Sequence, residues 1–191
     1  ENDSYRVTVN SDGDISGVYD KVHDQELLAA PSRLEILDDN STTWPSWEIM
    51  YHDVTSAPKA YVSGPAEIEI VEEGPVRVSL KIKRKALGST YEQVIRLTAG
   101  DDKQRVDIDN KVGWHTKAAN LKAAFPLAVS NPKATYDLGL GTIQRGNNTS
   151  SMYEVPAQQW ADLTDTSGEY GVSILNDCKY GWDKPDDNTL R

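Results

Sequence analysis

Apolar and polar residues alternate with a period of two along most of this chain. In Val76 to Lys83 (VRVSLKIK) every second side chain is apolar, and serine, arginine and lysine lie between them. Because successive side chains of a β-strand point to opposite faces of its sheet, this period predicts a strand with one buried face and one solvated face. The same pattern recurs from one end of the chain to the other, which favours antiparallel β-sheet throughout.

The preceding segment, Ala66 to Val71 (AEIEIV), alternates in the same way and is separated from Val76 by Glu72-Glu73-Gly74-Pro75. The two segments are therefore expected to form a β-hairpin. Its solvated face would set glutamates on one strand against lysines on the other, which stabilises a strand pair by about a few tenths of a kcal/mol for each exposed charge pair.

A second hairpin of similar design is expected to follow, with a turn at Gly100-Asp101-Asp102. Its first strand carries Tyr91, Ile95 and Leu97, and its second strand has four apolar side chains that should face inward, Val106, Ile108, Val112 and Trp114. The residues between them should face solvent, namely Arg105, Asp107, Asp109 and Lys111. Shorter strands are predicted at Tyr5 to Val9, Ile15 to Tyr19, Leu34 to Leu37, Leu121 to Leu127 and Val172 to Leu175.

No segment has the period of an amphipathic helix, and Gln25 to Ala30 could form only one helical turn before Pro31 ends it. About ten to fourteen short strands without a βαβ rhythm predict an all-β fold. We expect one domain over residues 1–191, built as two large antiparallel sheets packed face to face.

Composition excludes several classes of protein. The formal net charge of -10 disfavours nucleic acid as a partner, and no apolar run approaches the roughly 18 residues that a membrane span needs, so a soluble protein is expected. Cys178 is the single cysteine, and His23, His52 and His115 have no zinc-binding spacing, so no metal ligand is assigned. With neither a signal peptide nor a disulfide pattern visible, a cytoplasmic location is favoured. The first residue, Glu1, is interpreted as a domain boundary.

No motif for acyl transfer or phosphate binding is present. A glycosidase needs two carboxylates roughly 5 to 10 Å apart, but the abundant acidic residues identify no such pair. Asp107 with Asp109 and Glu67 with Glu69 are interpreted as solvated strand residues, and Asp38-Asp39 and Asp101-Asp102 as turn formers. No catalytic residue is therefore assigned.

Two groups of residues are candidates for binding. The first is Trp44 and Trp47, in a polar loop of a chain with five tryptophans and one phenylalanine, because tryptophan can stack on the apolar face of a sugar ring or pack against another domain. The second follows an apolar strand, where binding loops often lie, and comprises Asn176, Asp177, Lys179 and Tyr180. An ordinary structural turn is the alternative for this second group.

The run from Trp160 to Gly181 has WADL at its start and YGVSILNDCKYG at its end. With this run, the chain resembles glycoside hydrolase family 38, which contains the α-mannosidases, and in particular its bacterial, vacuolar and cytosolic branch. Shorter likenesses lie upstream of this run, in the same order as in the family. They are at Trp44 to Ile49, Gly74 to Arg77 and Leu121 to Pro126. The resemblance extends over essentially the whole chain.

This resemblance implies a β-supersandwich related in fold to galactose mutarotase, possibly without its last strands, that is part of a retaining exo-α-mannosidase. In such enzymes a zinc ion and the catalytic residues belong to an α/β barrel and a helical domain, which would be partners of this chain, and the whole enzyme acts on terminal α-linked mannose of a glycan. The chain alone is then expected to be inactive and to hold no cofactor. The loop at Asn176 to Gly181 would face the cleft.

Two other functions are compatible with the residues. One is an autonomous carbohydrate-binding module that stacks sugar on Trp44, Trp47 or Trp182. The other is a mutarotase-like epimerase, which needs a histidine and a glutamate that converge on one sugar oxygen, and the three histidines give no sign of this.

Overall fold

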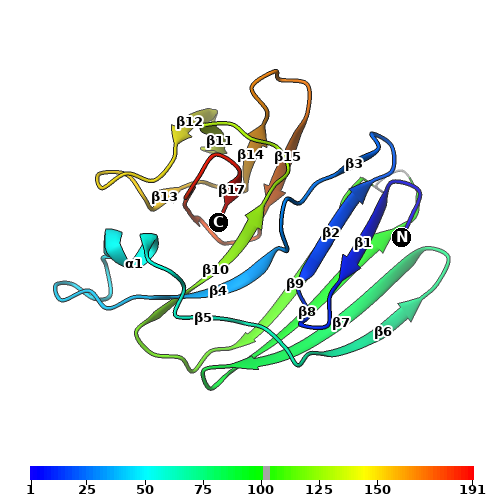
Figure 1. Cartoon of the computed structure of the whole chain (residues 1–191), viewed down its shortest axis with the longest axis horizontal. Coiled ribbons are helices and arrows are strands. Elements are labelled where there is room, and N and C mark those ends of the chain that lie inside the picture. Colours follow the sequence, from blue (N-terminus) through cyan, green and yellow to red (C-terminus); the bar gives the residue numbers. More distant parts are fainter. Residues whose placement is uncertain (101–103) are drawn as a thin grey trace.

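The computed structural model describes residues 1–100 and 104–191, and in this part of the chain the alternating segments form antiparallel strands (Figure 1). Three four-stranded sheets account for most of them. The first sheet has the strand order β6 (Glu67–Glu73), β7 (Arg77–Ala86), β8 (Ser89–Thr98), β9 (Asp107–Gly113). The second has the order β17 (Thr189–Leu190), β10 (Ala119–Pro126), β4 (Arg33–Asp38), β5 (Ala60–Tyr61). The third has the order β12 (Thr142–Gly146), β11 (Lys133–Asp137), β14 (Trp160–Thr164), β15 (Gly171–Leu175).

Two smaller sheets complete the described strands. They are β1 (Tyr5–Val9), β2 (Ile15–Asp20) and β3 (Gln25–Glu26), and the pair β13 (Val155–Pro156) with β16 (Gly181–Trp182). The all-β antiparallel class is thus confirmed, although the strands divide more finely than into two large sheets. One short helix, α1 (Tyr51–Thr55), lies between β4 and β5. No helix in the described ranges is long and apolar enough to cross a membrane.

The predicted first hairpin is confirmed together with its register. Glu67 pairs with Lys83 and Glu69 with Lys81, so acidic side chains of β6 lie opposite basic side chains of β7. Lys83 also pairs with Glu92 on β8, which extends the alternation of charges across three strands. The side chains of these pairs are exposed or half-buried, so the gain is about a few tenths of a kcal/mol per pair.

Three expectations for local structure are wrong. Val112 and Trp114 do not lie in a core, because their side chains are 37% and 38% exposed. Gln25 begins the short strand β3 and forms no helical turn. The helix α1 was not predicted, since its five residues are too few to show a helical period. The predicted turn residues Asp101 and Asp102 lie outside the described residues.

Three clusters of buried apolar side chains hold the sheets together. One joins β1 and β2 to the β6–β9 sheet through Ile15, Val18, Ile82 and Ile95. A second lies between the β4–β10 sheet and β8 around Tyr91. The third and largest packs the inner face of β11, β14 and β15 against β10, β16 and β17. Burial of this apolar area is the main favourable contribution to folding.

A buried ion pair joins three of the sheets. Asp14, at the start of β2, accepts a hydrogen bond from Nη1 of Arg84 on β7 (2.9 Å) and another from Nε of Arg33 on β4 (3.0 Å). Nη1 of Arg84 also donates to the carbonyl oxygen of Val62, and the Arg84 guanidinium contacts Gln93. Because both charges of the Asp14–Arg84 pair are out of water, each depends on the other for compensation.

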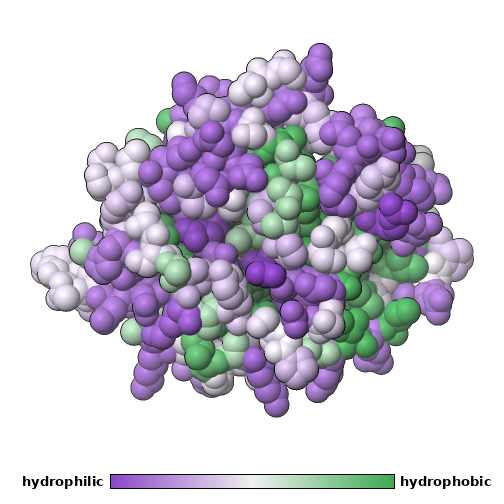
Figure 2. All heavy atoms as spheres, in the orientation of Figure 1, coloured by the Kyte–Doolittle hydropathy of each residue, from purple (hydrophilic) through white to green (hydrophobic). Residues whose placement is uncertain are grey.

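The β6–β9 sheet keeps an apolar margin on its free side. Ile68, Ile70 and Val76 are 42%, 63% and 69% exposed. Figure 2 shows apolar side chains at the lower right of the molecule, where Figure 1 places β6. The layer made by β1 to β3 therefore covers the middle strands of this sheet and leaves its β6 edge open.

Candidate functional site

The segment that follows β15 is a tight, exposed loop organised by Asn176. The side-chain Oδ1 of Asn176 accepts a hydrogen bond from the backbone N–H of Lys179 (2.7 Å), and its Nδ2 donates to the carbonyl of Gln158 (3.1 Å). Its backbone N–H donates to the carbonyl of Gln159. Of the four candidate residues here, Asn176 thus has its amide engaged inside the protein and acts as a turn former.

The next side chains, Asp177, Lys179 and Tyr180, point to solvent. Cys178 between them has a φ of +68°, and its Sγ lies 3.1 Å from Oδ1 of Asp177. A hydrogen bond with Cys178 raises the pKa of Tyr180. The loop therefore presents a carboxylate, an ammonium and a phenol on one short stretch, an arrangement suited to hydrogen bonding with a polar ligand or an adjoining domain.

The two loop tryptophans stack on each other. The ring centroids of Trp44 and Trp47 are 6.1 Å apart with an interplanar angle of 18°. The backbone N–H of Trp47 donates to the backbone carbonyl of Trp44. Their side chains are 65% and 86% exposed. The pair therefore presents a continuous aromatic surface to solvent.

Trp182 is not available as a stacking platform. It is 5% exposed and belongs to the largest apolar cluster. Among the described residues, no hydrogen bond, ion pair or ring contact joins Trp44 or Trp47 to the Asn176–Gly181 loop. The structure therefore does not bring the two predicted groups into contact with each other.

A buried network of charges fixes the chain directly after the loop. Asp183 is 1% exposed and accepts hydrogen bonds from Nε (3.0 Å) and Nη2 (2.7 Å) of Arg191 and from Nδ2 of Asn148 (2.8 Å). Lys122 donates to both carboxylate oxygens of Glu154 and lies 3.4 Å from Asp183. Burial raises the pKa of Glu154 more than the charge of Lys122 lowers it.

The residues present do not fit a zinc site. Among residues 1–100 and 104–191, no group of three or more histidine, cysteine, aspartate or glutamate side chains is arranged to hold a metal ion. The neighbouring carboxylates Glu154 and Asp183 already have Lys122 between them. His23 and His52 each contact a neighbouring aspartate, Asp20 and Asp53.

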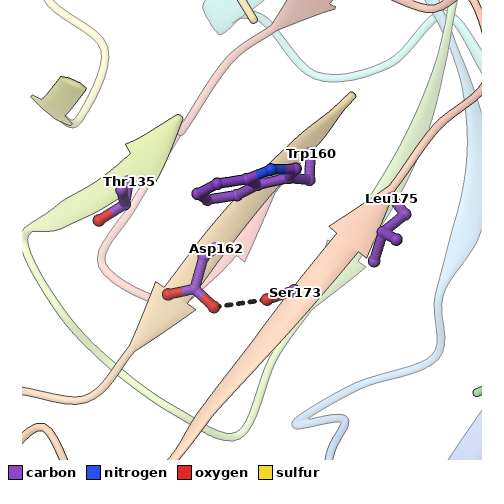
Figure 3. Close-up of a pocket in the computed structure, with 5 residues that line it drawn as sticks. All are labelled: Thr135, Trp160, Asp162, Ser173 and Leu175. Carbon is purple, nitrogen blue, oxygen red and sulfur yellow. Dashed lines mark hydrogen bonds between the residues drawn. The ribbon is translucent and has the colours of Figure 1, made fainter. Parts of the chain in front are cut away.

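Sequence reasoning missed a shallow depression of about 390 Å³ on the outer face of the β11–β14–β15 sheet. Figure 3 shows the five side chains that line it, Thr135, Trp160, Asp162, Ser173 and Leu175. The signal was present in β14, where Ala161 and Leu163 are buried and the residues that alternate with them face outward. The contribution of β11 and β15 depends on strand pairing and is not visible in any one segment.

The fold and these surfaces define an all-β sandwich domain whose polar and aromatic groups lie on exposed loops and on an outer sheet face. Residues 1–191 match the family described as Glycosyl hydrolases family 38 C-terminal domain. The chain belongs to this family.

Relatives agree with this assignment. The chain is 30% identical to Alpha-mannosidase 2C1 of Mus musculus over 95% of its own length and 18% of that protein. It is 32% identical to Alpha-mannosidase of Saccharomyces cerevisiae over 85% of its length and 16% of that protein. The crystal structure of an α-mannosidase from Enterococcus faecalis V583 has the same fold over the whole chain, with a TM-score of 0.75 at 15% identity, and the match covers 24% of that structure. The chain thus spans less than a fifth of the curated relatives.

Proposed function

We propose that this chain is the non-catalytic β domain of a retaining, zinc-dependent exo-α-mannosidase that removes terminal α-linked mannose from glycans. One observation carries the proposal: the chain matches the family's C-terminal domain over residues 1–191 but spans only 16 to 18% of the α-mannosidases from mouse and yeast. The zinc ion and the catalytic groups then belong to the barrel and helical domains of the same enzyme. The zinc would supply Lewis-acid chemistry there.

Within such an enzyme, the exposed loops are the surfaces that would contact the other domains. Trp44 and Trp47 project from the domain as a stacked pair, and isolated domains rarely leave two tryptophans this exposed unless they meet another surface. The Asn176–Gly181 loop is held firmly at both ends, by Asn176 and by the Asp183 network. We assign Asp177, Lys179 and Tyr180 to the rim of the active-site cleft, where a fixed loop can orient polar groups toward the sugar.

Two assays test this role. The 191-residue chain, supplied with zinc and an aryl α-mannoside, should show no turnover, and turnover that persists through rigorous purification would contradict the proposal. In the whole α-mannosidase, Asp177→Ala should lower kcat/KM more than it lowers the unfolding temperature. Glu169→Ala is the matched control, because Glu169 is an exposed acid in the turn at the other end of β15. Equal kinetics in the two variants would leave the Asp177 loop without a role in the cleft.

The exposed tryptophan pair also keeps a second function open, that of an autonomous carbohydrate-binding module. In this case Trp44 or Trp47, but not the buried Trp182, would supply the stacking surface. Calorimetric titration of the chain with mannose or mannobiose separates the two functions. A dissociation constant below about 1 mM that is lost in Trp47→Ala would favour the binding module.

A further inference from the structure

Trp160 and Asp162 lie side by side on the outward face of β14, because they are two residues apart on one strand. Figure 3 shows the indole of Trp160 extending across the sheet toward Thr135, with Asp162 beside it and Ser173 on the neighbouring strand. Leu175 pairs directly with Trp160 across β14 and β15. The shallow depression is thus lined by one aromatic, one aliphatic and three polar side chains.

The polar side chains around Asp162 are arranged to accept hydrogen bonds. The hydroxyl of Ser173 donates to Oδ2 of Asp162 (2.7 Å), and the hydroxyl of Thr164 donates to Oδ1 (2.6 Å). Both hydroxyl protons therefore bond within the protein. The remaining lone pairs of the carboxylate and of the two hydroxyls can accept hydrogen bonds from a ligand. The two bonds also hold the carboxylate in one orientation, which lowers the entropy cost of binding a ligand.

A ligand that suits this surface has an apolar face and several hydrogen-bond donors. A pyranose ring has both, since its C–H face can stack on the indole while its hydroxyls donate to the carboxylate. The carboxylate of Asp162 and the net charge of -10 disfavour acidic sugars. An isolated cation would use the aromatic face and the carboxylate but would gain nothing from the aliphatic side chain of Leu175, which is 64% exposed.

We infer that the outer face of β11, β14 and β15 is a binding site for one uncharged hexopyranose unit of a glycan, with Trp160 as the stacking surface and Asp162, oriented by Ser173 and Thr164, as the hydrogen-bond acceptor. This site is separate from the Trp44–Trp47 pair. The inference does not rest on the proposed function, because it concerns the 191-residue chain and its own side chains.

The test uses the 191-residue chain labelled with ¹⁵N, in which each tryptophan gives one indole N–H signal. Trp160→Phe assigns the signal of Trp160. Titration with methyl α-mannopyranoside and with methyl α-glucopyranoside should shift that signal saturably, with a dissociation constant of about 1 mM or somewhat weaker. Asp162→Asn and Ser173→Ala should each weaken binding by about fivefold or more. Thermal unfolding of every variant is measured alongside to show that it is folded.

Trp47→Ala is the control variant and should bind the sugars as the unaltered chain does. Four results would overturn the inference. The first two are a Trp160 signal that does not move at tens of millimolar sugar, and saturable binding that is unchanged in folded Asp162→Asn and Ser173→Ala. The other two are sugar-induced shifts confined to the signals of Trp44 and Trp47, and a shift of the Trp160 signal that only Nα-acetylarginine amide produces and that salt abolishes. The last result would identify a basic peptide as the ligand.

Discussion

Asp14 and Arg84 form an ion pair at 2.9 Å in which each side chain is only 2% exposed. The pair joins the turn of the β1–β2 hairpin to the middle of the β6–β9 sheet, 70 residues away in sequence. Its loss would leave Arg84 buried and without its charge partner, which costs more than the loss of an exposed ion pair.

Asp14→Ala should therefore lower the free energy of unfolding by about 3 to 5 kcal/mol. Chemical denaturation with urea measures this change. Ser11→Ala is the control, because Ser11 is an exposed residue of the same turn, and its effect should stay within about 0.5 kcal/mol. Equal effects of the two substitutions would show that the Asp14–Arg84 pair has no special weight.

Gly13 should tolerate no side chain. Its φ is +83°, and a Cβ would lie 2.7 Å from Cγ2 of Ile82 and 3.0 Å from Cβ of Ala66. Gly88 has a similar φ of +81° with open space around it. Gly88→Ala should thus lower the free energy of unfolding by about 1 kcal/mol, because of the backbone conformation alone. Gly13→Ala should carry this same cost and about 1 to 3 kcal/mol more, because its Cβ overpacks the site. Similar unfolding midpoints for the two variants would contradict this assignment.

Asp183 should be the most sensitive carboxylate near the candidate loop. Asp183 is 1% exposed, and its charge is compensated by two hydrogen bonds from Arg191 and by Lys122 at 3.4 Å. Asp183→Ala should therefore cost about 3 to 5 kcal/mol. Glu169→Ala, which removes an exposed negative charge, should change stability by less than about 0.5 kcal/mol. A small effect of Asp183→Ala on the melting temperature would mean that the network is dispensable for folding.

Stability should fall in acid partly through Asp20. Burial opposes ionisation of this carboxylate, but hydrogen bonds from the side chain and backbone of His23, the N–H of Val22 and the hydroxyl of Tyr170 outweigh it, and together they lower the pKa of Asp20. A lowered pKa in the folded state gives stability that is present above the ordinary pKa of 3.8 and is lost as pH falls through the lower, folded-state pKa.

Urea titrations from pH 7 down to strongly acidic pH, on the unaltered chain and on Asp20→Asn, measure this contribution as the difference between the two curves. The difference should shrink as the pH falls below 3.8. A difference that stays constant with pH would contradict the assignment to ionised Asp20.

Tyr136 should be replaceable by phenylalanine. Its side chain is 0% exposed, its hydroxyl has no hydrogen-bond partner among the described residues, and burial raises the pKa of Tyr136 to about 12. Tyr136→Phe removes an unpaired buried hydroxyl and should leave stability unchanged or raise it by about 1 kcal/mol. Tyr170→Phe, which removes a hydroxyl that donates to Asp20, should instead cost about 1 kcal/mol. A larger loss from Tyr136→Phe would reveal a partner for its hydroxyl.

The strands and some of their pairing could be predicted from alternation alone. Alternation in Ala66 to Lys83 was enough to predict the hairpin and the glutamates opposite lysines across it, because side chains two residues apart share a face. It did not show that Ile68 and Ile70 on the apolar face of β6 are exposed. The same rule gave the wrong answer for Val112 and Trp114, since alternation indicates which face a residue is on and says nothing of whether another layer covers that face there.

The candidate sites show the same limit. Trp44 and Trp47 were singled out by residue type, but only the fold distinguishes them from Trp182, which is of the same type and is buried. Trp160 and Asp162 were part of the segment that resembles the family, yet their common surface with Ser173 and Thr135 arises from the pairing of β14 with both the next strand, β15, and the more distant β11. Sequence gives the neighbours along a strand, and tertiary structure gives those across it.

The free edge of β6 has a consequence for self-association. Among residues 1–100 and 104–191, no strand pairs with the outer side of β6, and the register with β7 is interrupted by an irregularity between Ile70 and Glu72. Two copies that approached edge to edge would bring together two strands that each carry Glu67, Glu69, Glu72 and Glu73. Repulsion between these carboxylates and the break in the backbone register both oppose edge-to-edge strand addition beside the open apolar margin of β6.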